Sequence, residues 1–363
     1  MIDGFLYKYI YLIFVWILTL STVNQYYRTN CYLAPKNRSF GIQTFGVMIF
    51  LIFFIGLRPN SYMFVDHMNF YFEYQRLYGL PANYSLEAEN FLFDNILPFF
   101  SSNKIPVEFY FLLIAAIYFG GIAWASKKLF PNDTFLAFLM YLGAFSTFSY
   151  GTNGIKAGAA ASIFLVALAY KDNLKVCIPL LWVSLGFHHS MLAPVVAFAI
   201  AFFFRNPKYC FYAWLLCLLL AAAHITSFME YFSGFTDDHG AKYLNTNVKN
   251  TVLYVSGFRP DFILYSAVPI FLGYYYIQKE KIISDTYNFL WCVYTLTNCV
   301  FLLCTYGTFI NRIAYLSWLM LPFVLLYPVL YCEEDAFQHR NLCYVVYGHL
   351  GFTLFMNVFY YGL

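Results

Sequence analysis

Long runs of apolar residues, separated by short polar segments, repeat along the whole 363-residue chain. A helix needs about 20 mostly apolar residues to cross the hydrocarbon core of a membrane, with a range of about 17 to 25. Twelve segments approach that requirement, and we predict them as membrane spans: 5–23, 41–57, 106–126, 135–150, 155–170, 176–188, 190–204, 209–228, 261–277, 286–306, 313–331 and 341–361. The segments on either side of His188-His189 also fit one bent span or two half-length spans.

The composition supports a membrane protein and excludes other classes. Hydrophobic residues make up 61% of the chain and charged residues only 11%, far below the charged fraction of about a quarter in soluble proteins. We therefore predict an all-α, polytopic membrane protein with one transmembrane domain over residues 1–363. A net charge of +3 gives no reason to expect a nucleic-acid partner. Since residues 21–25 do not resemble a cleavage site, we expect the first apolar run to remain as a span.

Positively charged residues predict the orientation of these spans. One alternating set of loops holds twelve of the 21 Lys and Arg residues, whereas the opposite set holds eight in longer loops. Because cytoplasmic loops carry the excess of Lys and Arg, the first set is predicted to be cytoplasmic. The two longest loops, 58–105 and 229–260, are then external.

Loops of this length in a compact protein are usually either functional or disordered. These two loops contain too many aromatic residues for disordered segments. We expect short helices at the membrane interface in them. In the first loop, Ser85 is a candidate N-cap. Leu92, Ile96 and Phe99 would then share one face of the helix that follows.

The cysteines and histidines do not indicate a metal site or a disulfide framework. None of the nine cysteines lies in the two external loops, and none shows Cys-x-x-Cys spacing. Adjacent histidines such as His188 and His189 project to different faces of a helix, and no third ligand is spaced with them. We therefore expect no metal and no cofactor, and we interpret most cysteines as small residues at helix interfaces.

The stretch from Tyr150 to Ser162 places Lys156 about one turn inside a predicted span. Small residues surround the lysine and would let neighbouring backbones approach closely; they are Gly154, Ala157, Gly158 and Ala161. Two interpretations stay open for Lys156. It is either a lysine that extends to the interface from a packing helix or part of a functional site.

Other cations recur at the same predicted membrane depth, at the external ends of spans that are far apart in sequence. They are Arg58, Arg259 and Arg312. Together with Lys156 they could converge on one anion, and the planar fork of arginine suits phosphate. The alternative is that each arginine only anchors a helix end at the lipid headgroups.

The order of the polar motifs is more specific than any one motif. Leu57-Arg58 is followed by Asp66 and Tyr71, then by Asn153-Gly-Ile-Lys156, Phe187-His188-His-Ser190 and Asn311-Arg-Ile-Ala-Tyr315. This order resembles the EpsG-like family of Wzy-type polysaccharide polymerases. Family members usually have Arg-Gln where this chain has Lys156-Ala157, and a Gly-x-Asp motif where it has Phe64-Val-Asp66 at a longer spacing.

The resemblance implies a GT-C-like membrane glycosyltransferase in the bacterial cytoplasmic membrane, with its active site facing the exterior. Its substrates would be undecaprenyl-diphosphate-linked repeat units of an O-antigen, capsule or exopolysaccharide, and membrane lipid and a chain-length regulator would be its partners. The implied roles are as follows: a general base, Asp66 or His188; diphosphate binding, Arg58, Lys156, Arg259 and Arg312; glycan binding, Tyr71, Tyr74, Asn153 and Tyr315.

Two other classes of function stay open at this point. A flippase or other transporter of lipid-linked oligosaccharides would also have about twelve spans, although inverted repeats typical of transporters are not evident in the sequence. A membrane O-acyltransferase would also use a histidine within the membrane, with an acyl donor that arrives from the cytoplasmic side.

Overall fold

The computed structural model describes residues 4–28, 41–229, 258–279, 282, 284–307, 310–332 and 338–360, and all regular structure in these ranges is helical. The long helices are α1 (Gly4–Arg28), α2 (Ile42–Gly56), α6 (Val107–Leu129), α9 (Ile155–Ala169), α10 (Leu174–Phe187), α11 (Leu192–Phe203), α12 (Pro207–Ala222), α15 (Pro260–Gln278), α16 (Asp285–Leu303), α18 (Leu321–Tyr331) and α19 (Gln338–Leu354), which continues as the π-helical turn η2 (Phe355–Tyr360). Shorter helices are α3 (Val65–Leu77), α4 (Phe91–Asp94), α5 (Ile96–Ser102), α7 (Thr134–Leu142), α8 (Thr147–Thr152), η1 (His189–Met191) and α17 (Ile310–Trp318). The prediction of an all-α protein is confirmed.

The helices form a polytopic membrane protein, as expected from the apolar runs. Within the described residues, five helices are long and apolar enough to cross a membrane, and five further apolar helices are shorter. Each of the twelve predicted spans coincides with a helix or a pair of helices, but the count of twelve crossings is not established by these lengths. The predicted span 135–150 is broken between α7 and α8, and 313–331 is broken between α17 and α18, just before Pro322. The first turn of a helix tolerates proline, because a backbone N–H group at that position would have no partner within the helix.

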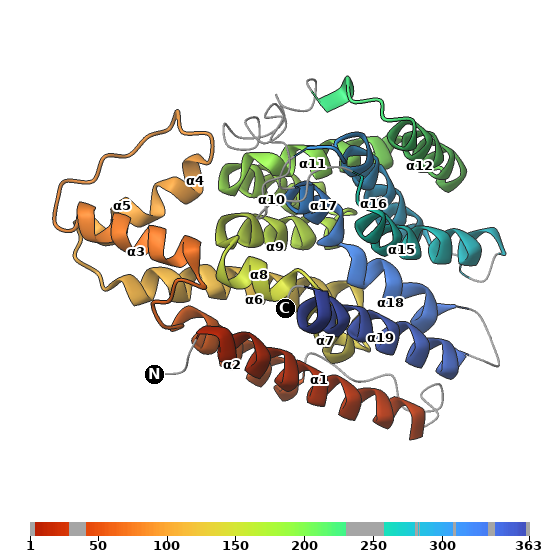
Figure 1. The fold of residues 1–363 in the computed structure, drawn as a ribbon, viewed down its shortest axis with the longest axis horizontal. Helices are drawn as coiled ribbons and strands as arrows, with labels where there is room; N and C mark the ends of the chain where they lie inside the picture. The colour runs from red at the N-terminus through yellow and green to blue at the C-terminus, as the bar shows by residue number, and fades with distance from the viewer. Residues whose placement is uncertain are drawn as a thin grey trace. The chain divides into compact units, whose positions relative to one another are not determined.

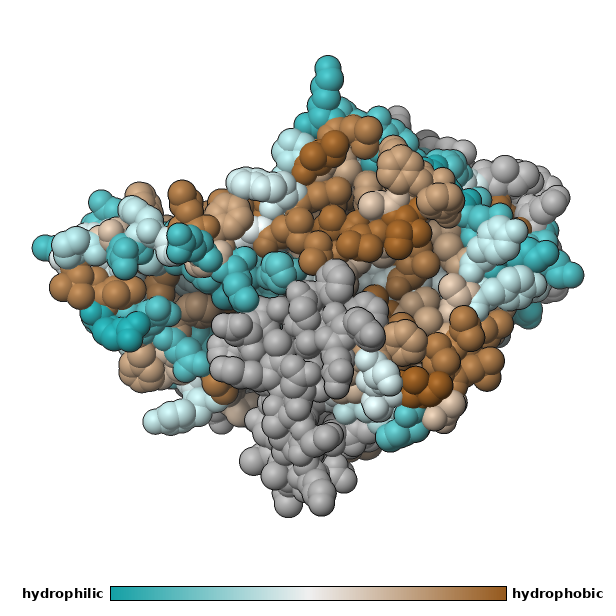
Figure 2. Space-filling model, turned by 90° about the horizontal axis from the view of Figure 1, so that it is seen from above, coloured by the Kyte–Doolittle hydropathy of each residue, from teal (hydrophilic) through white to brown (hydrophobic). Residues whose placement is uncertain are grey.

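Apolar side chains gather on the surface, as expected for helices that face lipid rather than water. Figure 2 shows wide hydrophobic areas on the face in view. On α1, for example, Ile13 and Ile17 are 59% and 61% exposed. Soluble proteins rarely expose such large apolar patches, so these surfaces agree with a membrane environment.

The chain divides into two compact units, which we describe separately. The first unit comprises residues 1–188 and 339–363, and the second comprises residues 189–338. The boundary lies at His188, where the extended backbone ends α10 before the short turn η1. The segments 176–188 and 190–204 are therefore two separate helices, and the single domain expected over 1–363 stays a prediction.

In the first unit, α6, α9 and α10 pack side by side (Figure 1). The close approach of α8 to α9 depends on Gly158, because a Cβ at this position would lie 2.5 Å from the backbone oxygen of Tyr150. The predicted role of this small residue in close backbone packing is thus confirmed. Ser162 connects α9 to α6, because its hydroxyl donates to the backbone oxygen of Ile117 at 3.0 Å.

The first long loop, 58–105, contains three helices: α4 packs against α10, α5 packs against α6, and α3 packs against α5 (Figure 1). The prediction of a helix capped by Ser85 is wrong: the helix starts at Phe91, and the backbone of Ser85 instead pairs with the side-chain amide of Asn95. The predicted face is also off by one residue, since Phe93, Leu97 and Phe100 are buried while Phe99 is 47% exposed. Residues 91–93 are apolar all round, so periodicity alone does not select the buried face. The helix α3 was not predicted. Most of the loop 229–260, which is predicted to be external, lies outside the described residues, since the structure does not describe residues 230–257.

In the second unit, α12 and α16 run parallel to each other. Their side chains meet at successive levels in the same order along both helices: Arg205 with Asp285, Cys210 with Cys292, Trp214 with Asn298, Cys217 with Cys299, and Tyr306 with the backbone oxygen of Ala221. One predicted span, 261–277, lies between these helices in the chain, so the predicted topology also requires them to be parallel.

This arrangement predicts a specific disulfide under oxidation. In a variant that retains only Cys217 and Cys299, copper phenanthroline should link the two thiols, which are hydrogen-bonded in the structure. A protease site inserted between residues 230 and 257 would then give two fragments that separate on a gel only after reduction.

The matched control retains Cys210 and Cys299 instead. Seven residues of helix separate Cys210 from Cys217, which is about 10 Å along the axis, and a disulfide needs Cα atoms within about 7 Å. This variant should not cross-link. Equal cross-linking of both pairs would show that α12 and α16 do not have the described register.

Candidate functional site

Arg58 is a buried cation at the start of the loop 58–105. It lies two residues after the end of α2, and its side chain is 5% exposed. One terminal nitrogen donates to the backbone oxygen of Ile55 at 2.8 Å, and the other donates to that of Thr152 at 2.9 Å. The guanidinium also lies against the aromatic rings of Phe64 and Phe111, 5.9 and 5.2 Å from their centroids. These contacts hold the guanidinium in one orientation.

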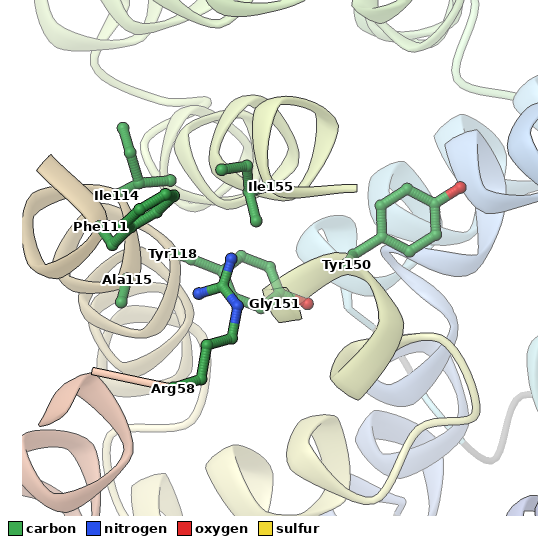
Figure 3. Close-up of a pocket in the computed structure, with 8 residues that line it drawn as sticks. All are labelled: Arg58, Phe111, Ile114, Ala115, Tyr118, Tyr150, Gly151 and Ile155. Carbon is green, nitrogen blue, oxygen red and sulfur yellow. The ribbon is translucent and has the colours of Figure 1, made fainter. Parts of the chain in front are cut away.

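The guanidinium of Arg58 faces a small pocket (Figure 3). The pocket contains about 220 Å³ of empty space, part of it open to the surroundings, and it is otherwise lined by Phe111, Ile114, Ala115, Tyr118, Tyr150, Gly151 and Ile155. Figure 3 shows the planar group pointing between Phe111 and Gly151, whereas the ring of Tyr150 extends away from it. The pocket thus has apolar and aromatic walls and one cation.

The charge of Arg58 is not neutralised by a hydrogen-bonded carboxylate among the described residues, and its Nε atom has no partner there. Burial lowers the pKa of the guanidinium to about 9, and the neighbouring Tyr7, Tyr110 and Asp66 act in the opposite direction. A pKa of about 9 still leaves the side chain charged at neutral pH. A buried charge without a close counter-ion is costly, so an anion that enters this pocket would be strongly favoured.

Asp66 and His67 lie in the first turn of α3, close to Arg58. Asp66 is half-buried and contributes to the electrostatic environment of Arg58. His67 is buried, stacks on Phe111 with a centroid distance of 4.0 Å, and donates from Nε2 to Oδ1 of Asn60 at 2.8 Å. Desolvation, with the nearby Arg58 charge as a smaller cause, lowers the pKa of His67 to about 3. His67 is therefore neutral at physiological pH.

The buried, neutral His67 predicts a loss of stability in acid. Its folded-state pKa lies below the ordinary value of 6.5, so the unfolded chain binds the proton first as the pH falls. The stabilisation is complete above pH 6.5 and is lost as the pH falls towards 3. Between about pH 7 and about pH 5, the melting temperature in detergent should fall more for the wild type than for His67→Gln, which keeps a donor for Asn60. An equal fall in both proteins would contradict the prediction.

Asn153 connects the loop 58–105 to the start of α9. Its side-chain amide donates to the backbone oxygen of Met63 at 3.1 Å, while its own Oδ1 is buried without a partner among the described residues. The preceding residue, Thr152, supplies the carbonyl that binds Arg58. The structure therefore brings the motif Asn153-Gly-Ile-Lys156 next to Arg58, although almost a hundred positions separate them in sequence.

Lys156 lies in the first turn of α9, as the sequence predicts. Its ammonium contacts Oδ1 of Asp94 at 2.9 Å and lies 5.5 Å from the ring centroid of Phe93. The side chains of Lys156 and Asp94 are 25% and 36% exposed. Lys156 is thus neither buried in a helix interface nor fully solvated, and its anionic partner comes from the loop 58–105.

The same loop segment contacts the end of α10, where the predicted Phe187-His188 motif lies. Phe93 packs edge-on against Phe187 at 5.9 Å, and Leu92 lies so close to Gly186 that a Cβ there would be 2.7 Å away. His188 itself is half-buried and follows the last residue of α10 in an extended conformation. The helix α4 therefore joins the Lys156 and His188 motifs in one region of the first unit.

The two tyrosines expected to bind glycan have different environments. Tyr71 is half-buried and packs edge-on against Phe72. Tyr74 is 3% exposed, and its hydroxyl donates to the backbone oxygen of Ile105 at 2.6 Å. In this structure Tyr74 fixes α3 to the end of the loop, so Tyr71 is the better placed of the two to contact a ligand.

The remaining predicted residues, Arg259, Arg312 and Tyr315, belong to the second unit. Arg259 is buried, binds Asp261 through Nε and a terminal nitrogen, and lies 3.8 Å from the ring centroid of Phe262. Arg312 is exposed at the start of α17, and Tyr315 is buried one turn further along. The charge of Arg259 is thus compensated within its own unit, and that of Arg312 faces outward.

Sequence reasoning did not assign Asp94 or His67 to the site. Asp94 is one of several acidic residues in the loop, and its contact with Lys156 spans 62 positions. No group of three or more His, Cys, Asp or Glu residues arranged as metal ligands is present in the described part of the chain.

Residues 42–362 match the model of the EpsG family. Neither a curated protein nor a solved structure matches the chain.

Proposed function

Since this chain belongs to the EpsG family of polysaccharide polymerase-like membrane proteins, we propose that it is a glycosyltransferase that joins lipid-linked oligosaccharide repeats. The donor is a growing glycan on a polyprenyl diphosphate, and the acceptor is a hydroxyl group of the next lipid-linked repeat. The reaction takes place at the outer face of the bacterial cytoplasmic membrane, on a GT-C-like scaffold. The product is a surface polysaccharide such as O-antigen, capsule or exopolysaccharide.

The observation that supports this proposal most directly is the buried guanidinium of Arg58 beside a pocket. Transfer breaks the bond between the anomeric carbon and a diphosphate oxygen, and the bonding electrons leave with the diphosphate. A fixed cation that is present before the reaction stabilises this developing charge without reorganisation. Arg58 is fixed by two backbone carbonyls and two aromatic rings, and it has no bound carboxylate to displace among the described residues.

The acceptor oxygen forms the new bond to the anomeric carbon, and its proton must pass to a base. Asp66 is our first candidate, because it is half-buried and lies in the electrostatic environment of Arg58. His188, which follows Phe187 at the end of α10, is the second. General base catalysis requires such a group within hydrogen-bond reach of the acceptor hydroxyl. Lys156 is the second proposed diphosphate ligand of the first unit. Arg312 and Arg259, in the second unit, stay predicted diphosphate ligands, and Arg259 already binds Asp261.

Surface glycans from a strain without this protein test the proposal against its alternatives. Loss of a polymerase leaves single capped repeats on a gel, because the repeats still reach the outer face. Loss of a flippase leaves no repeats, and loss of an acyltransferase leaves glycans of normal length. Normal length or complete absence of repeats would therefore overturn the proposed function.

A further inference from the structure

The ion pair between Lys156 and Asp94 suggests how this cation is controlled. In the part of the chain that the structure describes, the Asp94 carboxylate is the hydrogen-bond partner of the ammonium group, at 2.9 Å. A lysine ammonium has three N–H donors, so two remain available in this geometry. The pair carries no net charge, however, and it therefore attracts an incoming anion less strongly than a lone ammonium would.

The position of Asp94 is set by the packing of the loop around it. Phe93 is 1% exposed and lies among Phe70, Tyr110 and Phe187, with centroid distances between 5.7 and 6.3 Å. Asn95, on the other side, donates to the backbone oxygens of Phe91 and Ser85. Asp94 is thus held between two anchored neighbours.

Lys156 is by contrast the movable partner. Its ammonium sits on a stem of four methylene groups, and a quarter of the side chain is exposed. The Arg259–Asp261 pair differs, because it is two residues apart on one helix start and more buried, at 10% and 25% exposed. The Lys156–Asp94 pair is therefore built from two different elements and is open to a ligand.

We propose that Asp94 is an internal counter-ion of Lys156, which the diphosphate of the lipid-linked substrate displaces. In the empty site the carboxylate occupies the position of a phosphate oxygen and holds Lys156 towards α4. When the diphosphate binds, the ammonium turns from Asp94 to a phosphate oxygen. Arg58, which has no such competitor, binds the same anion without this exchange. The inference rests on the proposed function, because it takes the ligand of Lys156 to be a lipid diphosphate.

If the diphosphate has to displace the Asp94 carboxylate from Lys156, the charge of Asp94 weakens diphosphate binding. Removing its charge while keeping its shape should free Lys156 for the ligand. An ion pair of this exposure contributes up to about 1 kcal/mol, so the affinity should rise about two- to fivefold. Asn at this position retains an oxygen that can accept from the ammonium, which keeps the side chain in place.

Binding of farnesyl diphosphate to the purified, full-length protein in detergent tests this inference by calorimetry, with farnesol as the ligand that lacks phosphate. Asp94→Asn should bind farnesyl diphosphate about two- to fivefold more tightly than the wild type. Asp172→Asn is the matched control, because Asp172 pairs with Lys171 at 2.7 Å elsewhere in the same unit. It should leave the affinity unchanged.

The double variant identifies the origin of the effect. Lys156→Ala should weaken binding, and adding Asp94→Asn to it should give no gain, because no ammonium is left to free. A similar gain in both backgrounds would show that Asp94 acts only as a nearby negative charge, and unchanged or weaker binding by Asp94→Asn alone would also overturn the counter-ion role. If Lys156→Ala does not change the affinity, the assignment of Lys156 to the diphosphate fails instead.

Discussion

Replacing Arg58 by lysine is expected to reduce polymerisation about 100-fold or more, the range that is typical for loss of one fixed donor to a developing negative charge. Lysine keeps a positive charge but has no planar fork. It cannot donate to the carbonyl groups of both Ile55 and Thr152 in the geometry of Arg58 and still present an edge to the pocket. Rates are measured with purified protein and lipid-linked repeats.

The same substitution elsewhere in the loop provides the control. Arg76 is 75% exposed on α3 and pairs with Glu73, so Arg76→Lys should polymerise at the wild-type rate. Thermal stability must be measured alongside, because Arg58 also connects α2 to α8. If Arg58→Lys melts earlier but the folded protein polymerises normally, Arg58 has a structural role only.

The sequence predicts the helices of this protein well, because long apolar runs can be satisfied in a membrane only as helices. It predicts breaks within them less well. The segment 135–150 is mostly apolar, yet α7 ends at Leu142 and α8 begins at Thr147. Here the hydroxyl of Thr147 donates to the backbone oxygen of Tyr141 at 2.6 Å, a contact between two helices that periodicity does not reveal.

The sequence indicated individual residues of the candidate site but not the contacts between them. The order of motifs indicated Arg58, Asn153 and Lys156. In the structure Arg58 binds the carbonyl of Thr152, next to Asn153, whereas Lys156 pairs with Asp94 of the loop. Asp94 could not be distinguished from the other loop carboxylates, because its position depends on Phe93 docking against Phe187. Contacts of this kind join distant segments, and local sequence patterns carry no information about them.

Replacing Lys156 by alanine is expected to abolish polymerisation, whereas Lys156→Arg should stay within about tenfold of the wild-type rate, which corresponds to about 1.4 kcal/mol of transition-state stabilisation. The family usually has arginine at this position, so the site should accept the larger cation. The control is Lys127→Ala, which should retain full activity. Lys127 lies in the last turn of α6, whereas the pocket residues Phe111 and Ile114 lie near the start of that helix. The rates are measured on the same purified substrates as for Arg58.

A structural explanation for the loss in Lys156→Ala can be tested separately. Without the ammonium, Asp94 would be a half-buried carboxylate without its hydrogen-bond partner, and this alone could disturb α4. If so, adding Asp94→Asn should restore activity, because it removes the uncompensated charge. We expect no restoration, since the double variant still lacks the cation that stabilises the leaving diphosphate. Recovery to near the wild-type rate would assign Lys156 a role in positioning the loop instead of in catalysis.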